Sequence, residues 1–73
     1  PMPGIFYRTA APDEPHFVDE GDVVSGEDTL CLIEAMKIFN PIKPDFSCQI
    51  IEILAENETA VEYDQPLFRI KKT

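Results

Sequence analysis

Apolar residues along this chain fall in short clusters, separated by polar stretches that contain proline, glycine, aspartate and glutamate. The clusters are rich in β-branched and aromatic residues, which favour strands over helices. We therefore expect many short strands rather than a few long helices. The expected strands cover residues 5–8, 17–18, 23–24, 29–33, 47–54 and 67–70, with a further apolar position at Val61.

Turn-forming residues separate these segments. Gly21 can adopt a positive φ, and we expect turns at residues 20–22, 25–28, 56–58 and 63–66. Pro12 and Pro15 exclude both a helix and a central strand between the first two expected strands, because proline lacks a backbone donor. This stretch is expected to be a protruding, semi-rigid loop. Residues 42–46 are typical of an edge segment whose prolines face outward.

The middle of the chain is ambiguous when only the local pattern is considered. Residues 34–37 are good helix formers, and Pro41 could end a helix. Residues 30–33 form an apolar run that also fits a buried strand. Local propensity by itself favours a helix over residues 30–39.

The pattern of turn, apolar pair, turn and apolar strand occurs twice, at a spacing of 37 residues. The matching pairs are Val24 with Val61, Leu30 with Leu67, Ile33 with Ile70, and Asp19 with Glu56. Two copies of a half that cannot bury its apolar face alone predict a two-fold sandwich of short strands. Lys37 lies in the connection between the two copies, which predicts that it stands at one end of the molecule.

Composition and charge narrow the class of protein. The 73 residues are 44% apolar, which is enough for one small domain with a core. Fourteen acidic and six basic residues give a net charge of −8, which argues against nucleic acid and anionic membranes as partners. Solubility accounts for this acidity. A basic docking surface on a partner protein is the alternative.

The cysteine and histidine content excludes two further classes. Cys31 and Cys48 are the only cysteines and His16 the only histidine, so neither a disulfide framework nor a zinc site is expected. Cys31 lies in an apolar run and is expected to act as a small buried hydrophobe. No apolar stretch is long enough to cross a membrane. The chain starts at Pro1, and we expect an excised domain whose lost N-terminal segment could have carried a targeting sequence.

Lys37 is a lone cation among apolar residues. Most surface lysines are simply solvated. If this segment were a hairpin, however, Met36 and Lys37 would be poor residues for its tip, since tight hairpins favour Asn-Gly or Asp-Gly. A local rule broken without evident gain often marks a functional site, and a reachable amine is what covalent acylation requires. Met36 also has a second interpretation, as a flexible filler of the core.

The tetrapeptide at residues 34–37 resembles the attachment site of the biotinyl domain family, and the similarity extends along nearly the whole chain. Residues 1–8, residues 28–31 with Asn40, and residues 62–67 resemble blocks of the carrier domains of acetyl-CoA carboxylase. Bacterial and plastid carriers of this type have an insertion called the thumb. In this chain the thumb corresponds to Thr9, Ala10, Ala11, Pro12, Asp13, Glu14 and Pro15.

The resemblance implies an all-β fold, a flattened β-barrel of two four-stranded antiparallel sheets with quasi-two-fold symmetry. One carrier domain would cover residues 1–73, and a hairpin at about residues 34–40 would replace the helix favoured by propensity. Lys37 would lie at its exposed tip. The chain departs from the family pattern at Ile38, at Gly26 and at two glycine positions occupied by Cys48 and Glu58. Three of these departures put the geometry of turns in question.

The resemblance also implies a function. A biotin protein ligase would recognise Glu34, Ala35 and Met36 and join biotin to Lys37 by an amide bond. Biotin carboxylase would carboxylate the biotin, and a carboxyltransferase would pass the carboxyl group to acetyl-CoA, giving malonyl-CoA for fatty-acid synthesis. The chain itself would be a carrier with no catalytic residue and no metal. The full-length protein would be oligomeric within the carboxylase complex, in the bacterial cytoplasm or the plastid stroma.

Three alternatives remain open. A biotinyl domain of another carboxylase, such as pyruvate or propionyl-CoA carboxylase, would be expected to lack the thumb. A lipoyl domain shares the fold but usually has aspartate before the lysine, where this chain has Met36. A β-barrel adaptor that binds protein through its acidic face would carry no modification at all.

Overall fold

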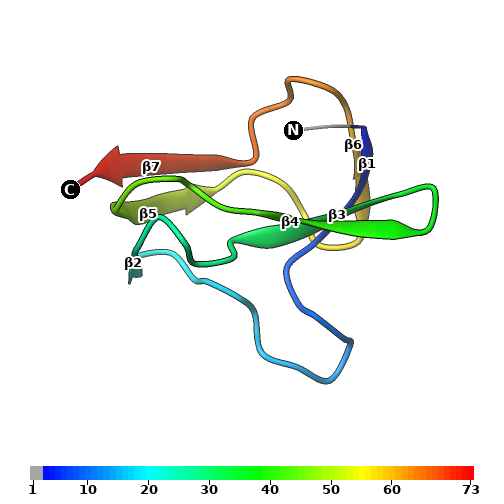
Figure 1. The fold of residues 1–73 in the computed structure, drawn as a ribbon, viewed down its shortest axis with the longest axis horizontal. Helices are drawn as coiled ribbons and strands as arrows, with labels where there is room; N and C mark the ends of the chain where they lie inside the picture. Colours follow the sequence, from blue (N-terminus) through cyan, green and yellow to red (C-terminus); the bar gives the residue numbers. More distant parts are fainter. Residues whose placement is uncertain (1–2) are drawn as a thin grey trace.

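The computed structural model describes residues 3–73, which form seven strands and no helix. The strands are β1 (Gly4–Tyr7), β2 (Val23–Val24), β3 (Cys31–Ala35), β4 (Ile38–Ile42), β5 (Cys48–Ile53), β6 (Thr59–Val61) and β7 (Phe68–Lys72). They make two antiparallel sheets, one in the order β4-β3-β1-β6 and one in the order β2-β5-β7 (Figure 1). The all-β class expected from the sequence is confirmed. The part of the family resemblance that falls on Pro1 and Met2 lies outside the described residues.

The core consists of two apolar clusters, and each cluster contains residues from both halves of the chain. The first contains Phe6, Cys31, Ile33, Ala55, Val61 and Leu67, and the second contains Val18, Val24, Leu30, Cys48 and Ile50. In each apolar repeat pair, one member belongs to or packs against one cluster and its match belongs to the other, as with Leu30 and Leu67. This exchange is what a two-fold relation between the halves requires, so the 37-residue repeat has a structural basis.

The strand orders show the same relation. The repeat matches β2 with β6 and β3 with β7, and the order β3-β1-β6 in one sheet corresponds to β7-β5-β2 in the other. The expected second sheet of four strands has three within residues 3–73, because no described segment matches β4 alongside β7. The architecture is therefore a four-stranded sheet packed on a three-stranded one.

Several expected boundaries are wrong. The helix favoured over residues 30–39 is absent, because β3 and β4 pair as a hairpin and Pro41 lies in the edge strand β4, where no ladder donor is needed. The expected strand at residues 17–18 is irregular, since the Val18 carbonyl oxygen accepts a hydrogen bond from the Arg8 side chain instead of a strand. Residues 43–46 form no strand, and β7 extends into the expected polar tail as far as Lys72.

Turns in this chain use left-handed backbone at residues other than glycine. Asp45, Glu58 and Asp64 have φ values of 70°, 64° and 68°. Glu58 occupies a position where glycine is common in the family, and it adopts the conformation that glycine would allow easily. Gly26 is required for a different reason, since a Cβ there would lie 2.7 Å from the backbone of Asp45. The departures from the family pattern thus change which residues carry strain and leave the turns in place.

No helix within residues 3–73 is long and apolar enough to cross a membrane.

Both thiols lie in the core. Cys31 and Cys48 have no exposed surface. Burial raises the pKa of the Cys31 thiol to about 12 and also raises the pKa of Cys48. The expectation that Cys31 acts as a small buried hydrophobe is confirmed.

We expect neither thiol to react with an aromatic disulfide reagent in the native protein at about pH 8, where unfolded cysteine is partly ionised. Both should react at once after unfolding in urea, because their burial and their raised pKa values are then lost. Absorbance of the released thiolate measures the reaction. Rapid labelling without denaturant would contradict the buried positions of both residues.

Candidate functional site

The hairpin of β3 and β4 extends beyond the neighbouring strands at one end of the molecule (Figure 1). Ala35 pairs with Ile38, so Met36 and Lys37 alone form the loop between the strands. Their φ values are 53° and 66°. Two central residues with positive φ in a two-residue hairpin loop are the signature of a type I′ turn. The structure thus places Lys37 at the tip of a tight hairpin.

This turn is strained by its residue types. Type I′ turns favour Asn-Gly, because other side chains clash with the backbone when φ is positive. Each non-glycine residue in this region costs about 1–3 kcal/mol. Full burial of one isoleucine, such as Ile33 in β3, contributes about 1.5–3 kcal/mol, so the packing at the base of the hairpin is large enough to hold the tip.

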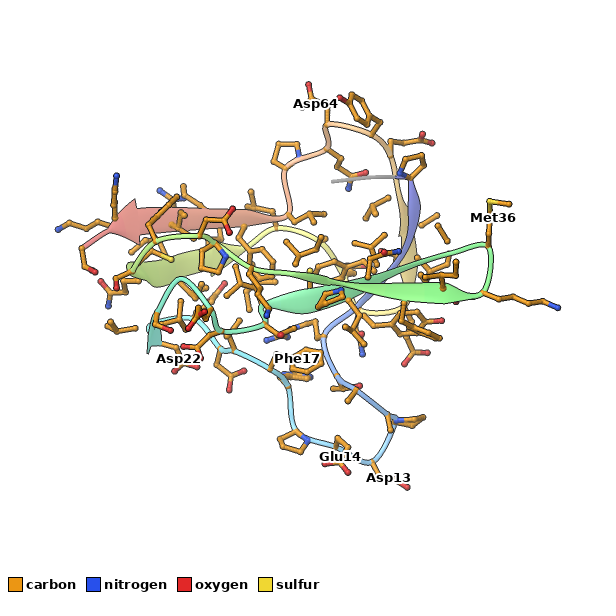
Figure 2. All side chains as sticks on the ribbon, in the orientation of Figure 1. Asp13, Glu14, Phe17, Asp22, Met36 and Asp64 are labelled. Atoms are coloured by element: carbon orange, nitrogen blue, oxygen red, sulfur yellow. The ribbon has the colours of Figure 1, made fainter. Side chains whose placement is uncertain are left out.

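Lys37 is exposed, and no hydrogen bond or ion pair joins its amine to any residue within 3–73. Met36 beside it has 93% of its surface exposed and points away from the sheets (Figure 2). The interpretation of Met36 as a filler of the core is therefore wrong. Ile38 and Phe39 are also exposed, so the amine stands at the end of an apolar, solvent-facing tip.

Glu34 and Ala35 lie below the tip in β3 and are half-buried. The Tyr7 hydroxyl donates a hydrogen bond of 3.2 Å to Glu34 Oε1, which ties the start of the tetrapeptide to β1. Burial, with the hydrogen bond to Glu34 and its charge, raises the pKa of Tyr7. The hydroxyl therefore stays protonated and keeps donating to Glu34 at neutral pH. Of the tetrapeptide, only Met36 and Lys37 are fully presented to solvent.

The thumb projects from the sheets between β1 and β2, with Asp13 and Glu14 at its outer end (Figure 2). The Glu14 amide donates to the Ala11 carbonyl oxygen at 3.0 Å, which closes a turn inside the thumb. Thr9, Ala10, Ala11 and Pro12 line one side of a hollow of about 320 Å³. The other side is formed by Tyr7, Phe39 and Glu58, and the Tyr7 and Phe39 rings are 5.7 Å apart.

Sequence analysis missed the residues on that other side. Tyr7, Phe39 and Glu58 belong to β1, to β4 and to the connection between β5 and β6, so only the pairing of distant strands brings them together. Glu58 alone gave a signal, as a substitution at a turn. The hollow begins two residues from Lys37 along β4, a distance of about 7 Å in an extended strand.

No group of three or more His, Cys, Asp or Glu side chains within residues 3–73 is arranged to hold a metal ion. Burial raises the pKa values of Tyr7 and of the two thiols. The geometry offers one exposed amine on a rigid support beside a small, partly apolar hollow.

Comparison with known proteins identifies this arrangement. The family model described as a biotin-requiring enzyme, Biotin_lipoyl, matches residues 1–70. The biotin carboxyl carrier protein of acetyl-CoA carboxylase from Nostoc sp. is 55% identical over 71 residues, which are 97% of this chain and 39% of that protein.

Relatives come from both plants and bacteria. The chloroplastic biotin carboxyl carrier protein of acetyl-CoA carboxylase from Glycine max is 51% identical over 97% of this chain and 27% of its own length. The biotin carboxyl carrier protein of acetyl-CoA carboxylase from Pseudomonas aeruginosa is 50% identical over 96% of this chain and 45% of its own length. The chain thus spans less than half of each of these three relatives.

We expect the double substitution Met36→Asn with Lys37→Gly to raise the free energy of unfolding by about 1–2 kcal/mol, because it supplies the residues that a type I′ turn favours. Urea denaturation followed by far-UV circular dichroism measures the change. Lys37→Ala is the matched control, since alanine removes the amine and keeps the strain, and it should give no such gain. Equal stability of the double variant and the wild type would contradict a strained turn.

Proposed function

This chain belongs to the Biotin_lipoyl family of biotin-requiring enzymes, and on that basis we propose that it is the biotin carrier domain of an acetyl-CoA carboxylase, with biotin joined to Lys37 by an amide bond. The single observation that carries this proposal is the position of the Lys37 amine. It lies at the exposed tip of a hairpin whose left-handed turn is made of residues unsuited to it. An amine without a structural partner is accessible to a modifying enzyme.

The tetrapeptide has two tasks in this proposal. Met36 and Lys37 are the residues that a biotin protein ligase would contact directly, because both are exposed. Glu34 and Ala35 would act mainly by setting the shape of the hairpin, since Glu34 accepts the Tyr7 hydrogen bond and Ala35 closes the turn with Ile38. Recognition would thus depend on a rigid tip rather than on a flexible peptide.

The thumb and the hollow beside it would receive the prosthetic group between reactions. A lysine side chain extended by the acid chain of biotin reaches roughly 13 Å, and the hollow begins about 7 Å along β4. Its volume of about 320 Å³ is at the lower end of the range for small-molecule sites. When attached, biotin supplies a ureido nitrogen that accepts and releases a carboxyl group. Thr9, Ala10, Ala11, Pro12 and Phe39 would limit the motion of its ring.

The wider role in this proposal follows from tethering. One tip that visits two active sites raises the effective concentration of its group at both, so the domain needs no catalytic residue of its own. The partners would be the biotin protein ligase, biotin carboxylase and a carboxyltransferase that forms malonyl-CoA from acetyl-CoA for fatty-acid synthesis. The whole protein would be oligomeric within the carboxylase complex. Its relatives include bacterial and chloroplastic proteins, which favours the bacterial cytoplasm or the plastid stroma.

The alternatives differ in what is attached to Lys37. A lipoyl domain would carry lipoate there, and an unmodified adaptor would carry nothing. A carrier of another biotin-dependent carboxylase would gain the same mass as the proposed domain but serve a different acceptor. The names of the relatives in plants and bacteria favour the acetyl-CoA enzyme.

We expect co-expression with a biotin protein ligase to increase the intact mass by about 226 Da, the mass of biotin less one water. Lys37→Arg should abolish the gain, because guanidinium does not form this amide. Lys43→Arg is the matched control, since Lys43 is an exposed lysine outside the hairpin tip and should leave the gain intact. A full mass gain in Lys37→Arg would refute attachment at Lys37.

We expect Phe39→Ala to increase the mobility of the biotin ring in the biotinylated protein, because it opens the hollow opposite the thumb. Narrowing of the ring proton signals in NMR spectra measures this. Tyr63→Ala removes an exposed aromatic ring that does not line the hollow, and it should leave the line widths unchanged. Equal line widths in all three proteins would show that the hollow does not hold the ring.

A further inference from the structure

The base of the thumb is closed by one residue, Arg8. Its amide donates to Asn57 Oδ1 at 2.8 Å, and its carbonyl oxygen accepts from the Phe17 amide at 2.8 Å. Its guanidinium Nη2 donates to the Val18 carbonyl oxygen at 3.1 Å and to Asp19 Oδ1 at 3.2 Å. Arg8, the residue before the thumb, is therefore bonded to Phe17, Val18 and Asp19 after the thumb. It is also bonded to Asn57 in the connection between β5 and β6.

These contacts differ in strength. The carboxylate of Asp19 is 70% exposed, and exposed ion pairs contribute little to stability. The Arg8 side chain is only 20% exposed, and Val18 is buried in the second core cluster. The hydrogen bond to the Val18 carbonyl oxygen is therefore the firmer contact, because it is better shielded from water than the ion pair with Asp19. This hydrogen bond connects the residue after β1 to the second core cluster.

The hydrogen bonds that hold the thumb to the sheets are at its base. Among the hydrogen bonds of residues 3–73, none joins residues 9–15 to a strand, and residues 10–15 are exposed. Its internal stiffness comes from the turn between Ala11 and Glu14 and from Pro12 and Pro15. A stiff loop fixed only at its base takes its direction from that base. The position of the thumb beside Phe39 is consequently set at this base, by the contacts of Arg8 and by the packing of Phe17 against the second core cluster.

We propose that Arg8 is the positioning residue of the thumb, and that it controls how tightly the hollow beside Lys37 closes on a tethered group. Its guanidinium does not line that hollow, so it acts through the thumb and not by touching the group. The effect on the tethered group rests on the proposed function. The effect on the thumb itself does not depend on it.

The first experiment uses the protein without biotin. In Arg8→Gln, backbone 15N order parameters of Thr9, Ala10, Ala11, Asp13, Glu14 and His16 should fall from the rigid range near about 0.85 to below about 0.6. Amides of β1, β3 and β5 should keep their wild-type values. Arg69→Gln is the matched control, because it breaks an Arg–Glu pair of 2.9 Å between β5 and β7 and should leave the thumb rigid.

Two outcomes would overturn the proposal. One is a rigid thumb in Arg8→Gln, and the other is an equal loss of order in the thumb and in all strands, which would make Arg8 a general folding residue. If Arg8→Gln does not fold, Arg8→Lys keeps the charge but lacks the fork that bonds the Val18 carbonyl oxygen and Asp19 together, and it should loosen the same residues. A rigid thumb in that variant would also overturn it.

The second experiment uses the biotinylated protein. Arg8→Gln should narrow the biotin ring proton signals to the width seen in Phe39→Ala, while the amides of the strands keep their wild-type order parameters. Wild-type line widths combined with a loosened thumb would overturn the control of the tethered group. Failure of the proposed function would appear separately, as the absence of the mass gain at Lys37, and would leave the order parameters of the thumb unaffected.

Discussion

The structure depends on the exchange of apolar side chains between two related halves. Leu30 and Leu67, and likewise Val24 and Val61, are buried in opposite clusters, so neither half has a complete core without the other. A domain of this size has a thin stability margin, and it obtains its core only by interleaving the halves. The connection between the halves is left outside this packing, and it is there that the chain exposes Lys37.

This division between a packed base and a free tip explains how a strained turn persists. Cys31 and Ile33 hold β3 in the core, and the pairs from Cys31 with Ile42 to Ala35 with Ile38 fix the register of β4. Met36 and Lys37 are then the only residues left to connect the strands, and they form a two-residue loop with positive φ. The residues that would remove the local cost, asparagine and glycine, lack a side-chain amine. A rigid turn also directs the amine outward, whereas a longer, relaxed loop would let it fold back.

The sequence predicted the class of fold, the repeat and the exposed lysine, because each is encoded in residues near one another or at a fixed spacing. It failed where distant segments decide. Propensity favoured a helix at residues 30–39, and pairing in a sheet overrode it. Val18 was expected in a strand, but its carbonyl oxygen accepts a hydrogen bond from the Arg8 side chain. The hollow lies between the thumb and Tyr7, Phe39 and Glu58, and Arg8 contacts residues far from it in the sequence. No local pattern predicts that these segments come together.

The pattern of strand pairing has a consequence for how the chain reaches this state. Within residues 3–73, the hairpin of β3 and β4 is the one pairing between consecutive strands, and every other ladder joins distant segments, such as Gly4 with Val61 or Cys48 with Lys72. Pairings of this kind lose loop-closure entropy before they gain contacts, which puts such β proteins among the slow folders, on a scale of about milliseconds to seconds. Within the described residues, the one pairing that can nucleate locally is also the hairpin whose loop holds two non-glycine residues at positive φ. The strain of the turn at Met36 and Lys37 is therefore expected to slow the earliest step of folding.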